Sequence, residues 1–187
     1  MFGFIPRQAA RQFEGGMKPD PDQRKPLIRL ATFADIPALQ QLDSLCGLNA
    51  WTPDVYKGLI LSDSCEVTVW INDRTVIGFC AVRSVCPDLE LLKIGVHPER
   101  QGEGIATALL HGALSDAIKA GCHECFLEVR WSNNRAISFY KKEGFEMVGI
   151  RRKYYRAPVE DARVMRKKMA FTATDVDGAT RTNTGRA

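Results

Sequence analysis

The sequence predicts an α/β (α+β) domain in which helices flank a mixed, mostly antiparallel, twisted sheet. Three observations indicate this class. The chain has 187 residues, 45% of them hydrophobic, which is enough for one domain with a sizeable core. Short apolar or alternating segments separated by turns indicate strands joined antiparallel. One amphipathic helix, 104–120, separates two such segments, and a helical crossover of this kind joins parallel strands.

The elements of the first half are indicated by alternation and by helix-start residues. Asp35 is suited to cap a helix that has Pro37 in its first turn, and Thr52-Pro53 starts a second helix in the same way. Val67, Val69 and Ile71 alternate along one strand face. We therefore expect strands over 27–31, 65–71, 76–85 and 89–96, and helices over 35–46 and from 52 onward.

The elements of the second half are separated by glycines. Gly121 ends the helix over 104–120, and Gly144 ends a shorter helix over 134–143. Strands are expected over 123–130, 145–155 and 161–170. The predicted order is β-α-α-β-β-β-α-β-α-β-β.

The ends of the chain differ in composition from its centre. Residues 1–26 finish in a polar stretch broken by prolines, and 171–187 are almost free of apolar residues, so we expect a flexible extension and a disordered tail around a domain over 27–170. Met17 lies inside the extension, so Met1 and Met17 both stay open as the start. Neither a membrane span nor a secretory signal is expected, and we predict a cytoplasmic protein.

Charge and metal-ligand spacing exclude several classes. The net charge of +4 permits acidic ligands without requiring nucleic acid, and the basic stretch 151–156 lacks an RNA-binding motif. Cys122 and Cys125 resemble half a zinc site, but no second such pair exists, and on one strand they would point to opposite faces. We expect no metal and six reduced, mostly buried thiols. The three histidines share no ligand spacing.

A glycine-rich loop follows the apolar strand Leu91–Val96 and precedes the long helix. It reads Gln101-Gly102-Glu103-Gly104-Ile105-Ala106. Backbone N–H groups at a helix N-terminus, with no Cβ in the way, suit a phosphate. The order Q-x-x-G-x-A is not the G-x-G-x-x-G fingerprint, and a Walker loop is excluded because G-K-[ST] is absent.

The loop resembles the pyrophosphate-binding loop of the GCN5-related N-acetyltransferase (GNAT) superfamily. This resemblance implies acetyl-CoA as cosubstrate, bound by the six loop residues and by free backbone groups of Ile94 and Val96. Gly95 indicates a bulge between them. Glu103 would repel a pyrophosphate, and Arg100 is close enough in sequence to compensate.

A second signature narrows the resemblance to bacterial ribosomal-protein N-terminal alanine acetyltransferases of the RimI type. It comprises Leu127-Glu128-Val129-Arg130, Ser132-Asn133, Phe139-Tyr140 with Gly144-Phe145, and Arg151-Arg152-Lys153-Tyr154-Tyr155. The resemblance implies that Glu128 is the general base, that Tyr140 is the general acid and that Asn133 binds the cosubstrate. The residues alone leave open a surface carboxylate, a core or rim tyrosine and a helix N-cap.

The same resemblance implies that Trp51, Tyr154 and Tyr155 lie on the substrate side, although packing of the tyrosines in an edge strand is an open alternative. The chain departs from the RimI pattern at Ala50, where proline is usual, and in its short hairpin 156–160.

These features lead to one main hypothesis. The protein transfers acetyl from acetyl-CoA to the N-terminal α-amine of a protein, an alanine-starting ribosomal protein, as a monomer or weak dimer. An α-amine has a pKa near ~8 and a lysine near ~10.4, so the first needs less help from a base. Acetylation of a small amine, such as a polyamine or aminoglycoside, or of a protein lysine remains an alternative, and so does a non-catalytic acyl-CoA-binding regulator.

Overall fold

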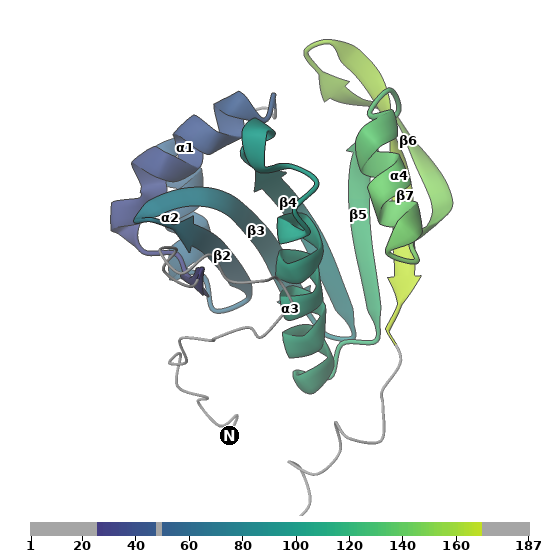
Figure 1. Cartoon of the computed structure of the whole chain (residues 1–187). Helices are drawn as coiled ribbons and strands as arrows, with labels where there is room; N and C mark the ends of the chain where they lie inside the picture. Colours follow the sequence, from purple (N-terminus) through teal and green to yellow (C-terminus); the bar gives the residue numbers. More distant parts are fainter. Residues whose placement is uncertain (1–25, 48–49, 170–187) are drawn as a thin grey trace, which may run out of the picture. The chain divides into compact units, whose positions relative to one another are not determined.

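A computed structural model of the chain describes residues 26–47 and 50–169. Seven strands form a mostly antiparallel sheet in the order β1-β2-β3-β4-β5-β7-β6, accompanied by four α-helices, which confirms the predicted fold class (Figure 1). The described residues divide into two compact units, which are taken in turn below. One holds the residues up to Arg83 with Leu91–Ala113, and the other holds Ser84–Glu90 with Leu114 onward. The predicted extension (apart from Pro26) and the predicted tail lie outside the described residues.

The observed elements follow the predicted order with ends displaced by a few residues. The helices are α1 Ile36–Leu45, α2 Pro53–Leu61, α3 Ile105–Lys119 and α4 Asn134–Lys142, with 3₁₀ turns at Phe33–Asp35 and Pro98–Arg100. The strands are β1 Leu27–Leu30, β2 Cys65–Asn72, β3 Thr75–Val85, β4 Asp88–Val96, β5 Glu124–Arg130, β6 Glu146–Arg156 and β7 Val159–Lys168.

The core of the first unit lies between the first two helices and strands β1 to β3. β1 pairs antiparallel with β2, and β2 with β3. The buried side chains that pack together are Ala31, Ile36, Leu39, Leu42, Tyr56, Val67, Val69, Phe79 and Ala81. Alternation in β2 places Val67 and Val69 in this core, as predicted from the sequence.

Helix capping in the first unit is partly as expected. The Thr52 hydroxyl accepts from the Val55 N–H at 3.4 Å, which confirms the predicted start of α2. Asp35 occupies the N-cap position of α1, but its side chain makes no cap hydrogen bond there, so this prediction was wrong in detail. Its carboxylate instead accepts two hydrogen bonds from Arg29, at 2.7 and 2.8 Å, and one from the Thr32 N–H at 2.7 Å. A charged donor pair outcompetes the weaker N–H donors of a helix end.

In the second unit β7 lies between β5 and β6 and pairs antiparallel with both. Gly144 follows α4 with φ of +85°, as expected for a helix stop, and the Lys167 ammonium on β7 donates to the Glu143 carbonyl. The connection between β6 and β7 is tighter than predicted, because Val159 and Glu160 already pair in β7 and leave only Ala157 and Pro158 between the strands.

β6 carries an irregularity that matters for the site. Arg151 pairs with Ala162 and Tyr155 with Glu160, so three residues of β6 lie opposite Asp161 alone. Lys153, in the middle, has φ of +51°, unusual for a residue with a side chain. The Asp161 carboxylate accepts from the Lys153 N–H at 2.9 Å and from the Arg152 guanidinium, and these bonds hold the bulge.

The cysteines are free thiols, four of them buried. β5 begins at Glu124, so Cys122 precedes the strand. The sequence had allowed Cys122 and Cys125 to lie on one strand, and the structure does not place them so. No group of three or more potential metal ligands gathers among the described residues. Within residues 26–47 and 50–169, no helix is both long and apolar enough to cross a membrane.

Candidate active site

The glycine-rich loop adopts a conformation that glycine makes possible. Gly102 and Gly104 have φ of +95° and +82°, and the Gly104 carbonyl accepts the first helical bond of α3 from the Ala108 N–H at 3.0 Å. Apart from the adjacent residues of the chain, no heavy atom among the described residues lies within 4 Å of a Cβ built on either glycine. The first turn of a helix leaves N–H groups without intrahelical partners. An open glycine loop at the start of a 15-residue helix fits a pyrophosphate.

The charge of Glu103 is compensated within the loop. The Arg100 guanidinium donates to both carboxylate oxygens of Glu103, at 2.7 and 2.9 Å. This hydrogen bonding lowers the pKa of Glu103 and raises that of Arg100, so both stay charged at neutral pH. The pair has no net charge, and the repulsion expected from Glu103 alone is therefore reduced.

The end of β4 is tied to the same loop. The Gln101 side-chain N–H donates to the Val96 carbonyl at 2.9 Å, and the Cys46 thiol donates to the same oxygen at 3.2 Å. The carbonyl of Val96 is therefore not free, contrary to the sequence-based prediction. A Cβ on Gly95 would lie 2.7 Å from the Phe79 ring, so close packing is a sufficient reason for this glycine.

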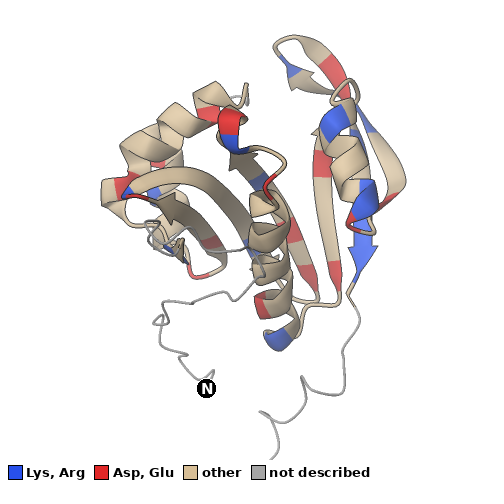
Figure 2. Ribbon diagram, in the orientation of Figure 1, with Lys and Arg blue, Asp and Glu red and all other residues tan. Residues whose placement is uncertain are grey.

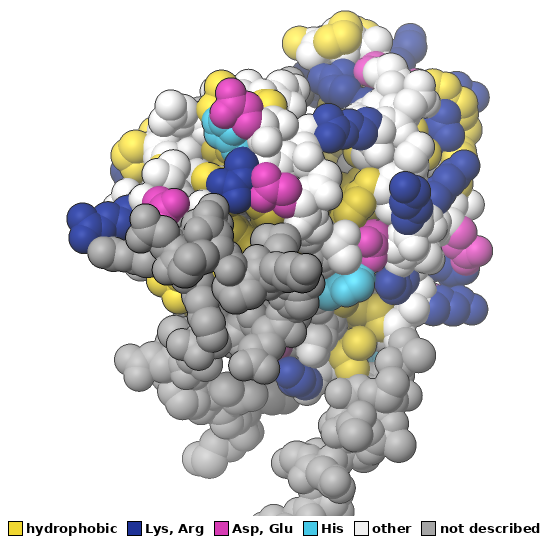
Figure 3. All heavy atoms as spheres, in the orientation of Figure 1, with side chains coloured by type: hydrophobic (Ala, Val, Ile, Leu, Met, Phe, Trp, Pro, Cys, Tyr) yellow, Lys and Arg dark blue, Asp and Glu magenta, His cyan; other side chains and the backbone are white. Residues whose placement is uncertain are grey.

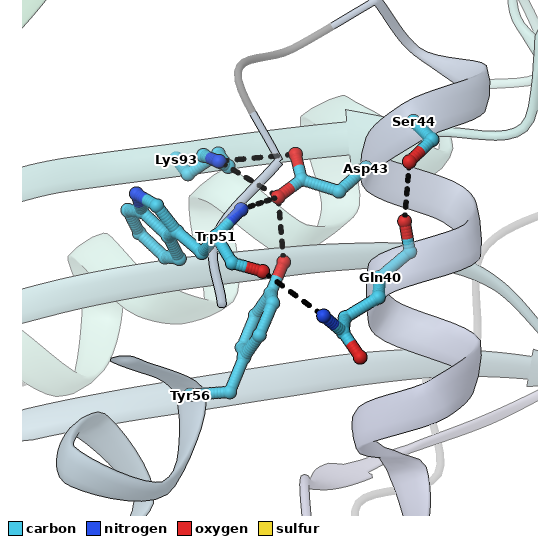
Figure 4. A network of polar contacts seen from close by, with 6 residues as sticks. All are labelled: Gln40, Asp43, Ser44, Trp51, Tyr56 and Lys93. Carbon is cyan, nitrogen blue, oxygen red and sulfur yellow. Dashed lines mark hydrogen bonds and ion pairs between the residues drawn. The ribbon is translucent and has the colours of Figure 1, made fainter. Parts of the chain in front are cut away.

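Trp51 belongs to a buried polar network in the first unit (Figure 4). The fully buried Asp43 on α1 accepts from the Lys93 ammonium with both oxygens, at 3.0 and 2.8 Å. Its Oδ2 also accepts from the Trp51 N–H at 3.0 Å and from the Tyr56 hydroxyl at 2.9 Å. The Lys93 ammonium lies 4.0 Å from the centre of the Trp51 ring, and Gln40 donates to the Trp51 carbonyl at 3.3 Å.

Burial dominates the electrostatics of this network. It lowers the pKa of Lys93, although the hydrogen bond and charge of Asp43 act in the opposite direction. Burial and the Asp43 carboxylate both raise the pKa of Tyr56. The tyrosine therefore stays a neutral donor, and Asp43 receives its hydrogen bonds from one cation and two neutral groups.

In the second unit Glu128 projects from the less buried face of β5. Cys125, Leu127 and Val129 are buried on the other face, while the Glu128 side chain is 18% exposed, which confirms the predicted division of the strand. The Arg151 guanidinium donates to Glu128 Oε1 at 2.8 Å. A carboxylate has about four lone-pair sites, so this bond leaves acceptor capacity for an amine or a water.

Tyr154, in the β6 bulge, and Tyr155, directly after it, adjoin Glu128. Their rings meet edge to face with centres 5.1 Å apart. Arg151 lies over the Tyr154 ring at 4.3 Å, and the Tyr155 hydroxyl donates to the Glu128 backbone carbonyl at 3.4 Å. Burial raises the pKa of Tyr154, and it raises the pKa of Tyr155 to about 12, so both hydroxyls are protonated at neutral pH.

Arg130 supports the second of these tyrosines. Its guanidinium lies 4.1 Å from the centre of the Tyr155 ring and donates to Glu160 at 3.1 Å and to the Ala157 carbonyl at 3.0 Å. Glu160 also accepts from the Ser132 N–H at 2.6 Å. The hairpin end is thus bonded to Arg130 and the loop after β5 to Glu160, and these two side chains are paired with each other.

Helix α4 holds the two remaining predicted residues. Asn133 is its N-cap, with the side-chain oxygen accepting from the Ala136 N–H at 3.1 Å, so the capping interpretation is confirmed. Tyr140 is 8% exposed, and its ring meets that of Phe145 at 5.7 Å. Basic side chains gather on α4 and on strands β6 and β7 (Figures 2 and 3).

Within each unit the structure brings together residues that the sequence predicted separately. Glu128, Tyr154 and Tyr155 form one contact group, and the loop is bonded to the end of β4. Sequence reasoning missed Asp43, Lys93 and the pairing of Arg151 with Glu128. The one signal for the Asp43–Lys93 pair was a lysine inside the apolar run Leu91–Val96, because a lysine is rarely buried without a partner.

Comparison with known proteins agrees with these features. The model of the Acetyltransferase (GNAT) family matches residues 36–145. Among curated proteins, the chain is 32% identical over 146 residues to the N-alpha-acetyltransferase RimI of Mycobacterium tuberculosis, covering 75% of this chain and 90% of that one. It is 38% identical over 129 residues to the [ribosomal protein bS18]-alanine N-acetyltransferase of Escherichia coli K12, covering 69% and 85%.

A solved structure is similar to this chain in fold as well. The crystal structure of the ribosomal-protein-S18-alanine N-acetyltransferase from Escherichia coli superposes with a TM-score of 0.71 at 26% identity, covering 79% of this chain and 96% of that one. The similarity therefore extends over nearly the whole length of these relatives.

Proposed function

Since the chain belongs to the GNAT family of acetyltransferases, we propose that it transfers the acetyl group of acetyl-CoA to the N-terminal α-amine of a protein. The proposed acceptor is a ribosomal protein whose first residue is alanine. The observation that carries this proposal is the similarity to two N-terminal acetyltransferases, at 32% and 38% identity, over 90% and 85% of their lengths. The aromatic pair beside Glu128 supports it, because it offers apolar surface next to a proton acceptor.

Most of the proposed cosubstrate contacts belong to the first unit. Acetyl-CoA, when bound, supplies the acetyl group as a reactive thioester. The backbone of the loop 101–106 and the start of α3 hold its pyrophosphate, because helix N-termini favour anions. Arg100 keeps Glu103 from opposing this binding. At the end of β4 the backbone of Ile94 and the N–H of Val96 are the proposed partners of the pantetheine arm, and Asn133 is a further polar partner.

Glu128 is the proposed general base. The attacking amine must be uncharged, and an α-amine with a pKa near ~8 already has an appreciable neutral fraction at neutral pH. A carboxylate acting directly or through one water is therefore sufficient. Arg151, whose side chain is 54% exposed, fixes one oxygen of Glu128 and leaves the other for this task.

Tyr140 is the proposed general acid. The departing thiolate needs a proton, and a phenol and an alkyl thiol have similar affinities for it, so the transfer is well matched. Packing against Phe145 and the capped ends of α4 fix the ring of Tyr140. Trp51, Tyr154 and Tyr155 are the proposed contacts of the acceptor peptide.

The proposal is tested with one peptide in matched forms. A peptide that starts with alanine and has an internal lysine is incubated with acetyl-CoA and the protein, beside the same peptide with a blocked N-terminus and a panel of small amines. Mass spectrometry should locate one acetyl group on the α-amine of the free peptide and none on the blocked one. Acetylation of the lysine, or of small amines alone, would contradict the proposal.

A further inference from the structure

The Asp43 network holds Trp51 at its backbone as well as at its ring. The backbone N–H of Trp51 donates to Asp43, its carbonyl accepts from Gln40, and its ring has the Lys93 ammonium at 4.0 Å. The Trp51 ring also meets the ring of Tyr56 edge to face, with the ring centres 5.5 Å apart. Both backbone groups and the ring are therefore held by side chains from α1, α2 and β4.

The network joins two functional segments of the first unit. Lys93 directly precedes Ile94, the start of the β4 segment assigned above to acetyl-CoA. Trp51 lies in the connection between α1 and α2, immediately before the N-cap Thr52. The bonds of Asp43 to Lys93 and to the Trp51 N–H thus tie the segment that carries Trp51 to strand β4.

Stability alone is a poor explanation for these charges. Asp43 has no exposed side-chain area and Lys93 only 10%. Taking an ion pair out of water costs more than apolar residues of the same size would, so a buried pair is weak evidence for a stabilising role. A buried charged network does, however, restrict its members to one arrangement, because any other leaves a charge without a partner.

We propose that Asp43 and Lys93 are positioning residues for Trp51, and that through it they set how well the first residues of the acceptor peptide bind. The inference rests on the proposed function for the identity of the acceptor. Gln40 assists them by donating a hydrogen bond to the Trp51 carbonyl.

The test compares two double variants of the full chain. Asp43→Asn with Lys93→Met removes both buried charges and nearly keeps side-chain size. Asp54→Asn with Lys57→Met makes the same changes at an exposed ion pair on α2, with side chains 89% and 54% exposed, and serves as the control. Gln40→Ala is a milder variant, which removes only the bond to the Trp51 carbonyl.

Two readouts are measured. Amide hydrogen exchange at Trp51 should be at least about tenfold faster in the buried double variant, because the side chain at position 43 that accepts from the Trp51 N–H has lost its fixed position. In the control the exchange rate should be unchanged. KM for the alanine peptide should rise about tenfold with kcat and acetyl-CoA affinity near wild type, as expected when a binding surface loses order. Gln40→Ala should change the exchange rate and the peptide KM in the same direction, by a smaller factor.

The outcomes separate the two proposals. Unchanged exchange at Trp51 in the buried double variant, or in Gln40→Ala if the double variant does not fold, overturns the positioning role. Faster exchange with an unchanged peptide KM overturns the link to the acceptor. If the wild-type protein acetylates no α-amine, the proposed function fails, while the exchange measurement still decides whether the network positions Trp51.

Discussion

Replacement of Gly104 by valine tests the cosubstrate loop most directly. Apart from the adjacent residues of the chain, the new Cβ would meet no heavy atom of the described residues within 4 Å, so the position is open toward the rest of the protein. Its cost to the free protein is the backbone strain of a β-branched residue at φ of +82°, roughly 1–3 kcal/mol. A pyrophosphate on the loop would meet the added side chain, and losing one charge-assisted hydrogen bond costs roughly 1.5–3 kcal/mol, or about 10- to 150-fold in Kd.

Calorimetric titration of acetyl-CoA into the folded variant measures this loss. Gly112→Val, inside α3 at an ordinary φ and also without contacts within 4 Å, is the matched control and should keep the wild-type Kd. Thermal unfolding of both variants shows how much stability each has lost. If Gly104→Val binds acetyl-CoA within about threefold of wild type, the loop does not hold the pyrophosphate.

Three further predictions concern catalysis, pH and the chain ends. Glu128→Gln should lower the rate by about 10²–10⁴-fold at neutral pH, and the rate should recover partly at high pH, where the amine is neutral. Tyr140→Phe should lower the rate by a similar factor without such recovery. Two pH–rate profiles that do not differ would contradict the two roles. Hydrogen bonds from Arg29 first, and from Thr32, lower the pKa of Asp35 from 3.8 to about 2, so its ionised form stabilises the fold at pH above 4 and this contribution disappears as the pH falls through 2. Denaturant titration should find Asp35→Asn less stable by at most roughly 2 kcal/mol at pH 7, with the difference narrowing below pH 4; a constant difference would refute the linkage. A chain of residues 27–170 should keep most of the activity and thermal stability, and a large loss of melting temperature would show that the removed segments stabilise the domain.

Local patterns were sufficient to predict most of the fold. Alternation placed Val67 and Val69 inward on β2, and glycines at 121 and 144 ended two helices because both adopt positive φ. Such signals depend on residues close in sequence. Asp35 shows their limit: the N-cap preference is local, but the stronger partner of its carboxylate, Arg29, lies on a strand whose distance from the helix start is set by tertiary structure.

The candidate site was predictable where a motif is continuous in sequence. The loop 101–106 was recognised as one segment, and the charge pairing of Glu103 with Arg100 is between residues three apart. The Asp43–Lys93 pair joins residues fifty positions apart, and no periodicity relates them. The pattern alone showed a charged residue in an apolar strand without showing which residue neutralises it.

The two tyrosines show why alternation fails at a bulge. In a regular strand, consecutive residues point to opposite faces, so Tyr154 and Tyr155 would not be expected to contact the same neighbour. On β6 the positive φ of Lys153, held by Asp161, interrupts the register between Arg151 and Tyr155. The Tyr155 hydroxyl then reaches the backbone of Glu128, while the arginine bound to the Glu128 side chain covers Tyr154. Both aromatic rings therefore adjoin the proposed base because of a bulge whose stabilising carboxylate lies on the other strand.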